Sequence, residues 1–207
     1  MKPWLFDILA CPIDKHFPLE LYIFSFETKP EEFESIINVY RNRDINYIKQ
    51  EKVVEISMEN EILLLKDNII MEKSPSTIYL ELIIASINEL DNITDKTNLE
   101  TSKNCFKIIE SEIKPKIIKF SKNINLNQIE DLLPELFFIN KIKLEIEIES
   151  GLLFCKNCGR WYPIIETIPQ MLPDEYRDEI KEVEFLKTKK NLLDEEFFNQ
   201  DLKPFNI

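Results

Sequence analysis

Glycine and histidine are almost absent from this chain of 207 residues, and their scarcity excludes several classes of enzyme. Only two glycines occur, Gly151 and Gly159, so no segment can form the glycine-rich loop of a P-loop protein or a dinucleotide-binding Rossmann fold. The same scarcity argues against an S-adenosylmethionine-dependent methyltransferase, because such enzymes usually have glycines at the cofactor loop. Histidine-based catalysis has a single candidate, His16. We therefore expect a protein that is not an enzyme.

Positive charge is also scarce. The chain has 26 lysines and arginines against 38 acidic residues, a formal net charge of −12, which argues against autonomous binding to nucleic acid. No apolar run approaches the length of a membrane span, and the N-terminal segment has no small-residue cleavage pattern. Four cysteines in a chain of this length do not suggest a disulfide framework. We expect a cytoplasmic protein that does not associate with membranes.

Hydrophobic periodicity predicts both helices and strands in the middle of the chain. Pro30 is expected to begin a helix, and Ser74 with Pro75 to form the N-cap and first turn of another. Asn125 is expected to cap a further short helix. Residues 52–57 and 61–65 are expected to form a pair of strands. Residues 91–104 are expected to form a polar loop, and an internal proline leaves the structure of residues 105–123 ambiguous.

The clearest strand pattern lies at 141–149, where isoleucine and leucine alternate with lysine and glutamate. Two more strands, 152–154 and 160–165, are expected to flank a tight turn at 155–159. The chain becomes acidic from Asp174 onward, and this part is predicted to be helical. Its apolar residues are spaced on one helix face: Ile180, Val183 and Leu186.

The spacing of the cysteines suggests a metal site. Cys155 and Cys158 form a Cys-x2-Cys pair that can direct two thiolates at one cation, and Gly159 permits the reversal of the backbone behind them. A tetrahedral site needs two more ligands, and Cys11 with His16 is the other pair at ligand-like spacing. A shared zinc ion would join the two ends of the sequence into one β-rich domain.

Two alternatives to a metal site stay open at this point. The three residues Cys11, Cys155 and Cys158 could be ordinary buried cysteines beside a surface histidine. Cys155 and Cys158 could instead form a redox dithiol, although no βαβ pattern surrounds them. The remaining cysteine, Cys105, is expected to be a packing residue.

Three short motifs give the sequence a family resemblance. They are LACPI at 9–13, GLLFCKNCGRWYPI at 151–164 and IPQMLP at 168–173. In this order they resemble the small zinc-binding activator subunits of methyltransferases, the Trm112 family. The resemblance places the family's four zinc ligands at Cys11, His16, Cys155 and Cys158, with histidine in place of the usual cysteine at position 16.

The resemblance implies an α+β fold with a small zinc-ribbon-like antiparallel β domain built from both chain ends. This domain is expected at 1–23 and 140–175, with a mainly helical insertion at 24–139 and an acidic helical tail at 176–207. The implied function is a non-catalytic partner in 1:1 heterodimers with S-adenosylmethionine-dependent methyltransferases that act on tRNA, rRNA or a translation release factor. Nucleic acid would then be bound only through the partner.

The methyltransferase contact is expected in the proline-separated apolar segment near the C-terminal motif. Its residues are Ile164, Ile165, Ile168, Pro169, Met171 and Leu172. This segment could pair an edge strand with the partner's sheet, or its side chains could simply fill the β domain. A different function also stays open, namely a zinc-ribbon module of the transcription or translation machinery.

Overall fold

The computed structural model describes residues 1–124 and 126–206, and its fold belongs to the α+β class that the sequence predicts. The chain forms two compact units, each assembled from segments that are distant in the sequence. Unit 1 contains residues 1–27, residues 91–98 and the chain from Glu147 onward. Unit 2 contains residues 28–90 and 99–146.

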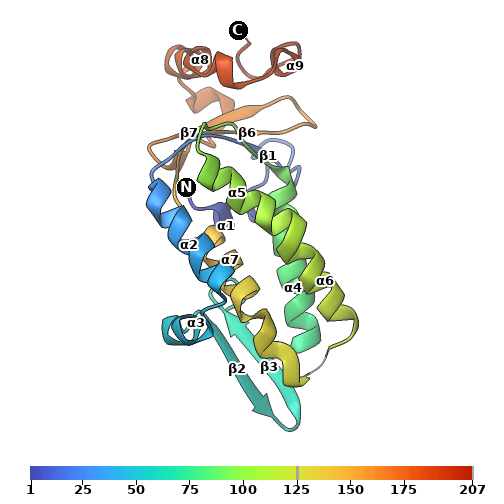
Figure 1. The fold of residues 1–207 in the computed structure, drawn as a ribbon. Coiled ribbons are helices and arrows are strands. Elements are labelled where there is room, and N and C mark those ends of the chain that lie inside the picture. Colours follow the sequence, from blue (N-terminus) through green and yellow to red (C-terminus); the bar gives the residue numbers. More distant parts are fainter. Residues whose placement is uncertain (125, 207) are drawn as a thin grey trace. The chain divides into compact units, whose positions relative to one another are not determined.

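Unit 1 is built on a five-stranded sheet with the strand order β5-β1-β6-β7-β8 (Figure 1). Strand β1 (Glu20–Phe26) pairs antiparallel with β6 (Ile148–Phe154), so segments from the two ends of the chain lie side by side. Strands β7 (Trp161–Ile165) and β8 (Ile168–Pro169) continue the antiparallel pairing. Strand β5 (Ile93–Asp95) runs parallel to β1. The sheet is therefore mixed, which corrects the expectation of a purely antiparallel domain.

The chain returns from unit 2 to unit 1 at residues 91–98. The sequence predicted a polar loop at 91–104 inside the insertion 24–139, and this prediction is wrong at β5. Beyond the strand, the backbone N–H of Lys96 donates to the carbonyl of Ile23 at 2.9 Å. A strand of three residues is too short to show an alternating pattern, so its pairing could not be recognised from the sequence.

The C-terminal segment, residues 174–206, packs on the sheet of unit 1 through α8 (Glu179–Thr188) and α9 (Glu195–Phe198). The predicted apolar face of this region is wrong at Ile180, which is 80% exposed, whereas Leu186 is fully buried. A hydrophobic cluster joins the sheet to the segment through Phe24, Leu152, Phe154, Trp161, Leu186, Leu193, Phe197 and Leu202. The shorter helices of unit 1 are α1 (Pro3–Phe6) and two 3-10 helices, Asp174–Tyr176 and Lys190–Leu192.

Unit 2 is mainly helical, and its longer helices lie alongside one another with the β2–β3 hairpin at one end (Figure 1). The helix that begins at Pro30 and the predicted hairpin are both confirmed. The helices are α2 (Pro30–Asn42), α3 (Ile45–Glu51), α4 (Ser76–Glu89), α5 (Glu100–Ile108), α6 (Lys114–Lys122) and α7 (Leu133–Leu144). The strands are β2 (Val54–Glu59), β3 (Ile62–Asp67) and β4 (Ser74–Pro75). A 3-10 turn at Leu90–Asn92, a π-helical turn at Ile109–Ile113 and a 3-10 helix at Leu126–Leu132 complete the elements. Among the described residues, no helix is both long and apolar enough to cross a membrane.

Helix α7 occupies the first part of the region 141–149, which has the clearest strand pattern in the sequence. The prediction of a strand at 141–149 is wrong, since helix α7 ends at Leu144 and strand β6 begins only at Ile148. Glu145 and Glu149 of the pattern are exposed, but its two lysines are buried. Lys143 is fully buried, and its Nζ donates to the carbonyl of Ser86 at 2.8 Å. A helix that is buried on all sides shows no amphipathic period, so alternation at its end resembled a strand.

The helix predicted to follow Ser74 and Pro75 is confirmed, but its start lies one residue later than expected. Ser74 and Pro75 form strand β4, and helix α4 begins one residue later with Pro75 as its N-cap residue. Pro115, which made the next region ambiguous, lies at the start of α6 directly after the π-helical turn. The chain is helical without a break from Glu100 to Lys122, and the π-helical turn accommodates Pro115, which has no N–H to donate. Asn125, the predicted cap, lies outside the described residues.

A buried acid joins three helical segments of unit 2. The carboxylate of Glu135 on α7 is 1% exposed and accepts hydrogen bonds from Arg43 and from Lys116 on α6, each at 2.8 Å. Glu130, by contrast, forms an ion pair with Lys49 at 2.7 Å, and its side chain is 58% exposed. The two glutamates therefore form a matched pair of ionic contacts that differ mainly in burial.

We expect Glu135→Gln to destabilise the protein by about 1–3 kcal/mol, because hydrogen bonds of a buried charged group are lost. The control Glu130→Gln should cost less than about 1 kcal/mol, as is usual for an exposed ion pair. Urea unfolding followed by circular dichroism measures both changes. Equal midpoints for the two variants would contradict the assigned role of Glu135.

Candidate metal centre

The chain reverses tightly between β6 and β7, and this turn carries two of the cysteines. The backbone N–H of Cys155 donates to the carbonyl of Arg160 at 2.8 Å, and the N–H of Gly159 donates to the carbonyl of Cys155 at 2.9 Å. Gly159 has a φ of 73°, in the left-handed region that glycine adopts without strain. We call residues 155–160 the second knuckle.

The segment between α1 and β1 repeats the same hydrogen-bond pattern. The N–H of Cys11 donates to the carbonyl of His16 at 3.0 Å, and the N–H of Lys15 donates to the carbonyl of Cys11 at 2.9 Å. Lys15 has a φ of 61° and thus takes the place of Gly159. We call residues 11–16 the first knuckle; its fourth residue, Asp14, corresponds to Cys158 in the second knuckle.

The two knuckles bring four possible ligand atoms together. One atom from each of Cys11, Asp14, Cys155 and Cys158 lies within 4.8 Å of the others. The sulfurs of Cys11 and Cys158 are 3.7 Å apart, and the Cys155 sulfur is 3.6 Å from the Asp14 carboxylate oxygens. Tetrahedral zinc with ordinary bond lengths requires separations of roughly 3.8 Å between two sulfurs and roughly 3.6 Å between sulfur and oxygen. The donor set therefore fits a four-coordinate metal ion.

Three of the four predicted ligands are thus close together, namely Cys11, Cys155 and Cys158. His16 is not in the cluster, and the fourth donor is Asp14. The backbone N–H of His16 instead donates to the Asp14 carboxylate at 3.0 Å. The sequence did contain a signal for Asp14, because the spacing Cys11-x2-Asp14 equals that of Cys155-x2-Cys158. Asp14 is neither a cysteine nor a histidine, the residue types most typical of zinc sites, so this equivalence was not recognised from the sequence.

The surroundings of the cluster shift the pKa values of Asp14 and Cys155 in opposite directions. Hydrogen bonds from the Asn157 amide, at 2.8 Å, and from the His16 N–H lower the pKa of Asp14 well below its usual range. Burial raises the pKa of the Cys155 thiol to about 12. A reactive redox cysteine needs a lowered pKa, so this environment does not favour the dithiol alternative. The hydroxyl of Tyr162, itself buried, lies 3.3 Å from the Cys11 sulfur.

The apolar residues predicted to bind a partner differ in their exposure. Ile164 on β7 is fully buried and belongs to the core of unit 1. Ile168 on the edge strand β8 is 60% exposed, and Leu172 after it is 43% exposed. The others are half-buried: Ile165, Pro169 and Met171.

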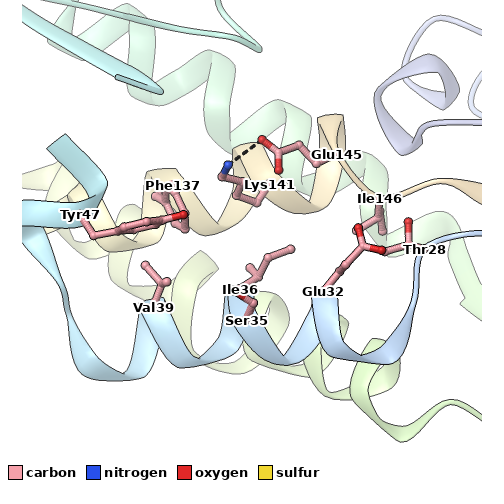
Figure 2. Close-up of a pocket in the computed structure, with 10 residues that line it drawn as sticks. All are labelled: Thr28, Glu32, Ser35, Ile36, Val39, Tyr47, Phe137, Lys141, Glu145 and Ile146. Atoms are coloured by element: carbon pink, nitrogen blue, oxygen red, sulfur yellow. Dashed lines mark hydrogen bonds and ion pairs between the residues drawn. The ribbon is translucent and has the colours of Figure 1, made fainter. Parts of the chain in front are cut away.

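Unit 2 contains a separate cavity of about 180 Å³ between α2 and α7 (Figure 2). Tyr47 and Phe137 lie at one end of it, and Glu32 lies toward the other. Lys141 points toward the cavity, where Glu145 accepts from its ammonium group at 2.7 Å. The same ammonium group pairs with Glu51 on α3 at 2.8 Å and lies 5.2 Å from the centre of the Phe137 ring. Lys141 therefore connects α7 to α3 through its ion pair with Glu51.

Comparison with known proteins gives a family. The model of the family described as "Trm112p-like protein" matches residues 2–166, which include both knuckles and strands β1, β6 and β7. The chain belongs to the Trm112p-like family. The resemblance predicted from the short motifs is therefore confirmed.

One curated relative adds a more detailed but shorter match. A stretch of 37 residues, 18% of this Trm112p-like chain, is 49% identical to the "Multifunctional methyltransferase subunit trm112" of Schizosaccharomyces pombe. The match spans 29% of the length of that protein. The C-terminal segment, from Asp174 onward, lies beyond the part of the chain that the family model covers.

The burial of the four cysteines predicts the order in which they react. After treatment with a chelator, Cys158 should react first with an alkylating reagent, because it is half-buried whereas the other three cysteines that the structure describes are buried. Cys105 should react only after unfolding, since burial also raises its pKa to about 12. Peptide mass spectrometry over a time course measures this order. Native-state labelling of Cys105 as fast as Cys158 would show that the predicted order is wrong.

Proposed function

We propose that this protein is a non-catalytic subunit that binds and stabilises an S-adenosylmethionine-dependent methyltransferase acting on tRNA, rRNA or a translation release factor. The observation that carries the proposal is the family match over residues 2–166. The S. pombe relative is named as a methyltransferase subunit, which supports the same function. The two proteins form a 1:1 heterodimer in the cytoplasm, and the partner holds the nucleic acid.

The exposed edge of the unit 1 sheet supports a docking role. Strand β8 is the last strand of the sheet, and it presents Ile168, with Leu172 just beyond it. An extended segment of the partner can pair with such an edge while its apolar side chains cover these two residues. Because the subunit binds only the folded methyltransferase, binding stabilises that enzyme by mass action. The net charge of −12 suits a basic partner.

We further propose that zinc occupies the cluster of the two knuckles in a small zinc-ribbon-like domain. Its ligands are Cys11, Asp14, Cys155 and Cys158, so Asp14 takes the role that the sequence assigned to His16. Four protein ligands leave no open position for water, which is typical of a structural site. When bound, the ion supplies a cross-link between the two ends of the chain.

The zinc proposal predicts different effects for the two residues of the first knuckle. Asp14→Ala should weaken zinc binding by at least about a hundredfold, because a direct ligand is lost and even supporting residues contribute 10–100-fold. His16→Ala should leave binding almost unchanged, since only the backbone of His16 completes the turn. Elemental analysis of the purified variants and competition with a chromophoric chelator measure this. If His16→Ala weakened zinc binding more than Asp14→Ala, His16 rather than Asp14 would be the fourth ligand.

The partner proposal is tested by co-expression with candidate methyltransferases. The wild-type protein should form a 1:1 complex, raise the solubility of its cognate enzyme and increase that enzyme's affinity for S-adenosylmethionine. Ile168→Asp should break the complex, because it places an unpaired carboxylate in an apolar contact. The matched control is Ile180→Asp on α8, another exposed isoleucine of unit 1, which should bind normally.

Size-exclusion chromatography and calorimetry measure complex formation, and circular dichroism checks that both variants are folded. If a folded Ile168→Asp variant binds as well as the Ile180→Asp control, strand β8 is not the interface. Recovery of no methyltransferase with the wild type would contradict the proposed function. Tight RNA binding by the protein alone would favour the zinc-ribbon module of the transcription or translation machinery instead.

A further inference from the structure

The C-terminal segment contacts the second knuckle, although it lies beyond the residues that the family model covers. The N–H of Lys203 donates to the carbonyl of Gly159 at 2.9 Å, and the carbonyl of Lys203 accepts from the N–H of Trp161 at 3.2 Å. These bonds form a short parallel bridge between Arg160 and Lys203. The backbone on the exit side of the knuckle is therefore held from outside the family motif.

The approach of the two segments is unusually close. A Cβ atom added to Gly159 would lie 2.3 Å from the carbonyl oxygen of Asp201. The indole N–H of Trp161 donates to the carbonyl of Phe205 at 3.1 Å, which fixes the segment a second time. Arg177 is enclosed between the rings of Trp161, Tyr162 and Phe205, with its guanidinium carbon 5.1–5.4 Å from the ring centres.

A charged side chain of the segment reaches the knuckle as well. The carboxylate of Asp174 accepts two hydrogen bonds from Arg160, at 3.1 Å from Nε and 2.8 Å from a terminal nitrogen. Asp174 and, after it, Cys158 both raise the pKa of Arg160 above its usual range, so the guanidinium lies near the Cys158 side chain as well as against the carboxylate of Asp174.

The net negative charge of an occupied metal site would favour a cation beside it. Three thiolates and one carboxylate around a divalent zinc ion leave a net charge of −2 at a largely buried site. Two other cations that the sequence places beside the cluster are engaged elsewhere. Lys15 donates to the carbonyl of Pro12 at 2.8 Å, and Lys156 pairs with Glu20 at 2.7 Å. Of these three cations, Arg160 is the one whose ion-pair partner, Asp174, belongs to the C-terminal segment.

We propose that the C-terminal segment, residues 174–206, retains the metal by holding the exit side of the second knuckle and by keeping the Arg160 guanidinium beside the cluster. Arg160 is a positioning residue, and Asp174 fixes its orientation. The inference rests on the proposed zinc site and adds a part of the chain that the family match does not include. Groups that hydrogen-bond to metal ligands commonly contribute 10–100-fold to metal affinity.

The test compares two identical substitutions in the same segment. Asp174→Asn removes the carboxylate that orients Arg160, whereas Asp178→Asn changes the N-cap of α8 and keeps a competent capping side chain. Zinc release to a chromophoric chelator should be about tenfold faster in Asp174→Asn than in wild type. Asp178→Asn should release zinc at the wild-type rate.

Cobalt substitution gives a readout that a general loss of stability would not change. The sulfur-to-cobalt charge-transfer band should shift in Asp174→Asn, because a displaced Arg160 guanidinium changes the positive charge near the Cys158 thiolate, and should stay unchanged in Asp178→Asn. If Asp174→Asn does not fold, Arg160→Lys serves instead, since it keeps the charge but loses the two-pronged pairing with Asp174.

The outcomes separate this inference from the proposal on which it rests. A wild-type protein that binds neither zinc nor cobalt contradicts the metal site itself. A wild type that binds metal, with equal release rates and unchanged bands in both variants, overturns the role of the C-terminal segment. Equal acceleration in Asp174→Asn and Asp178→Asn also overturns it, because the effect would then be one of general stability.

Discussion

The antiparallel pairing of β1 with β6 is the constraint on which the rest of unit 1 depends. Its register places Leu21 opposite Leu153 and Glu20 opposite Phe154. The first knuckle directly precedes β1 and the second directly follows β6, so this register brings the two turns to the same end of the sheet. The ligand cluster and the close approach of the C-terminal segment both follow from that pairing, since neither knuckle holds four donors alone.

The features that sequence reasoning predicted well depend on short stretches of chain. The second knuckle combines Cys155, Cys158 and Gly159 within five residues, so its geometry depends on residues that are neighbours in the sequence. The helix at Pro30 and the β2–β3 hairpin are local in the same sense. The equivalence of Asp14 and Cys158 was not predicted, because it becomes visible only when the backbone hydrogen bonds of the two turns are compared.

Long-range packing accounts for the features that the sequence did not reveal. Lys143 resembled a solvated strand residue, but its ammonium group finds a carbonyl acceptor on α4 inside unit 2. Strand β5 owes its existence to a partner, β1, that lies far away in the sequence. Ile180 fitted a helical period, yet the core of unit 1 contacts other residues of the segment. In each case the deciding neighbour is remote, and a single-sequence pattern carries no information about it.

A backbone hydrogen bond joins the two points where the chain first leaves unit 1 and finally returns to it. The N–H of Glu27, where the chain leaves unit 1, donates to the carbonyl of Glu147, where it returns, at 2.9 Å. Ends that already touch can be joined by a very short turn at little entropic cost. The chain between β1 and β6 is thus an interruption of a hairpin, with the two parts of unit 2 on either side of β5. Residues 28–90 and 99–146 can change in length without altering the register that aligns the two knuckles, provided that β5 still pairs with β1.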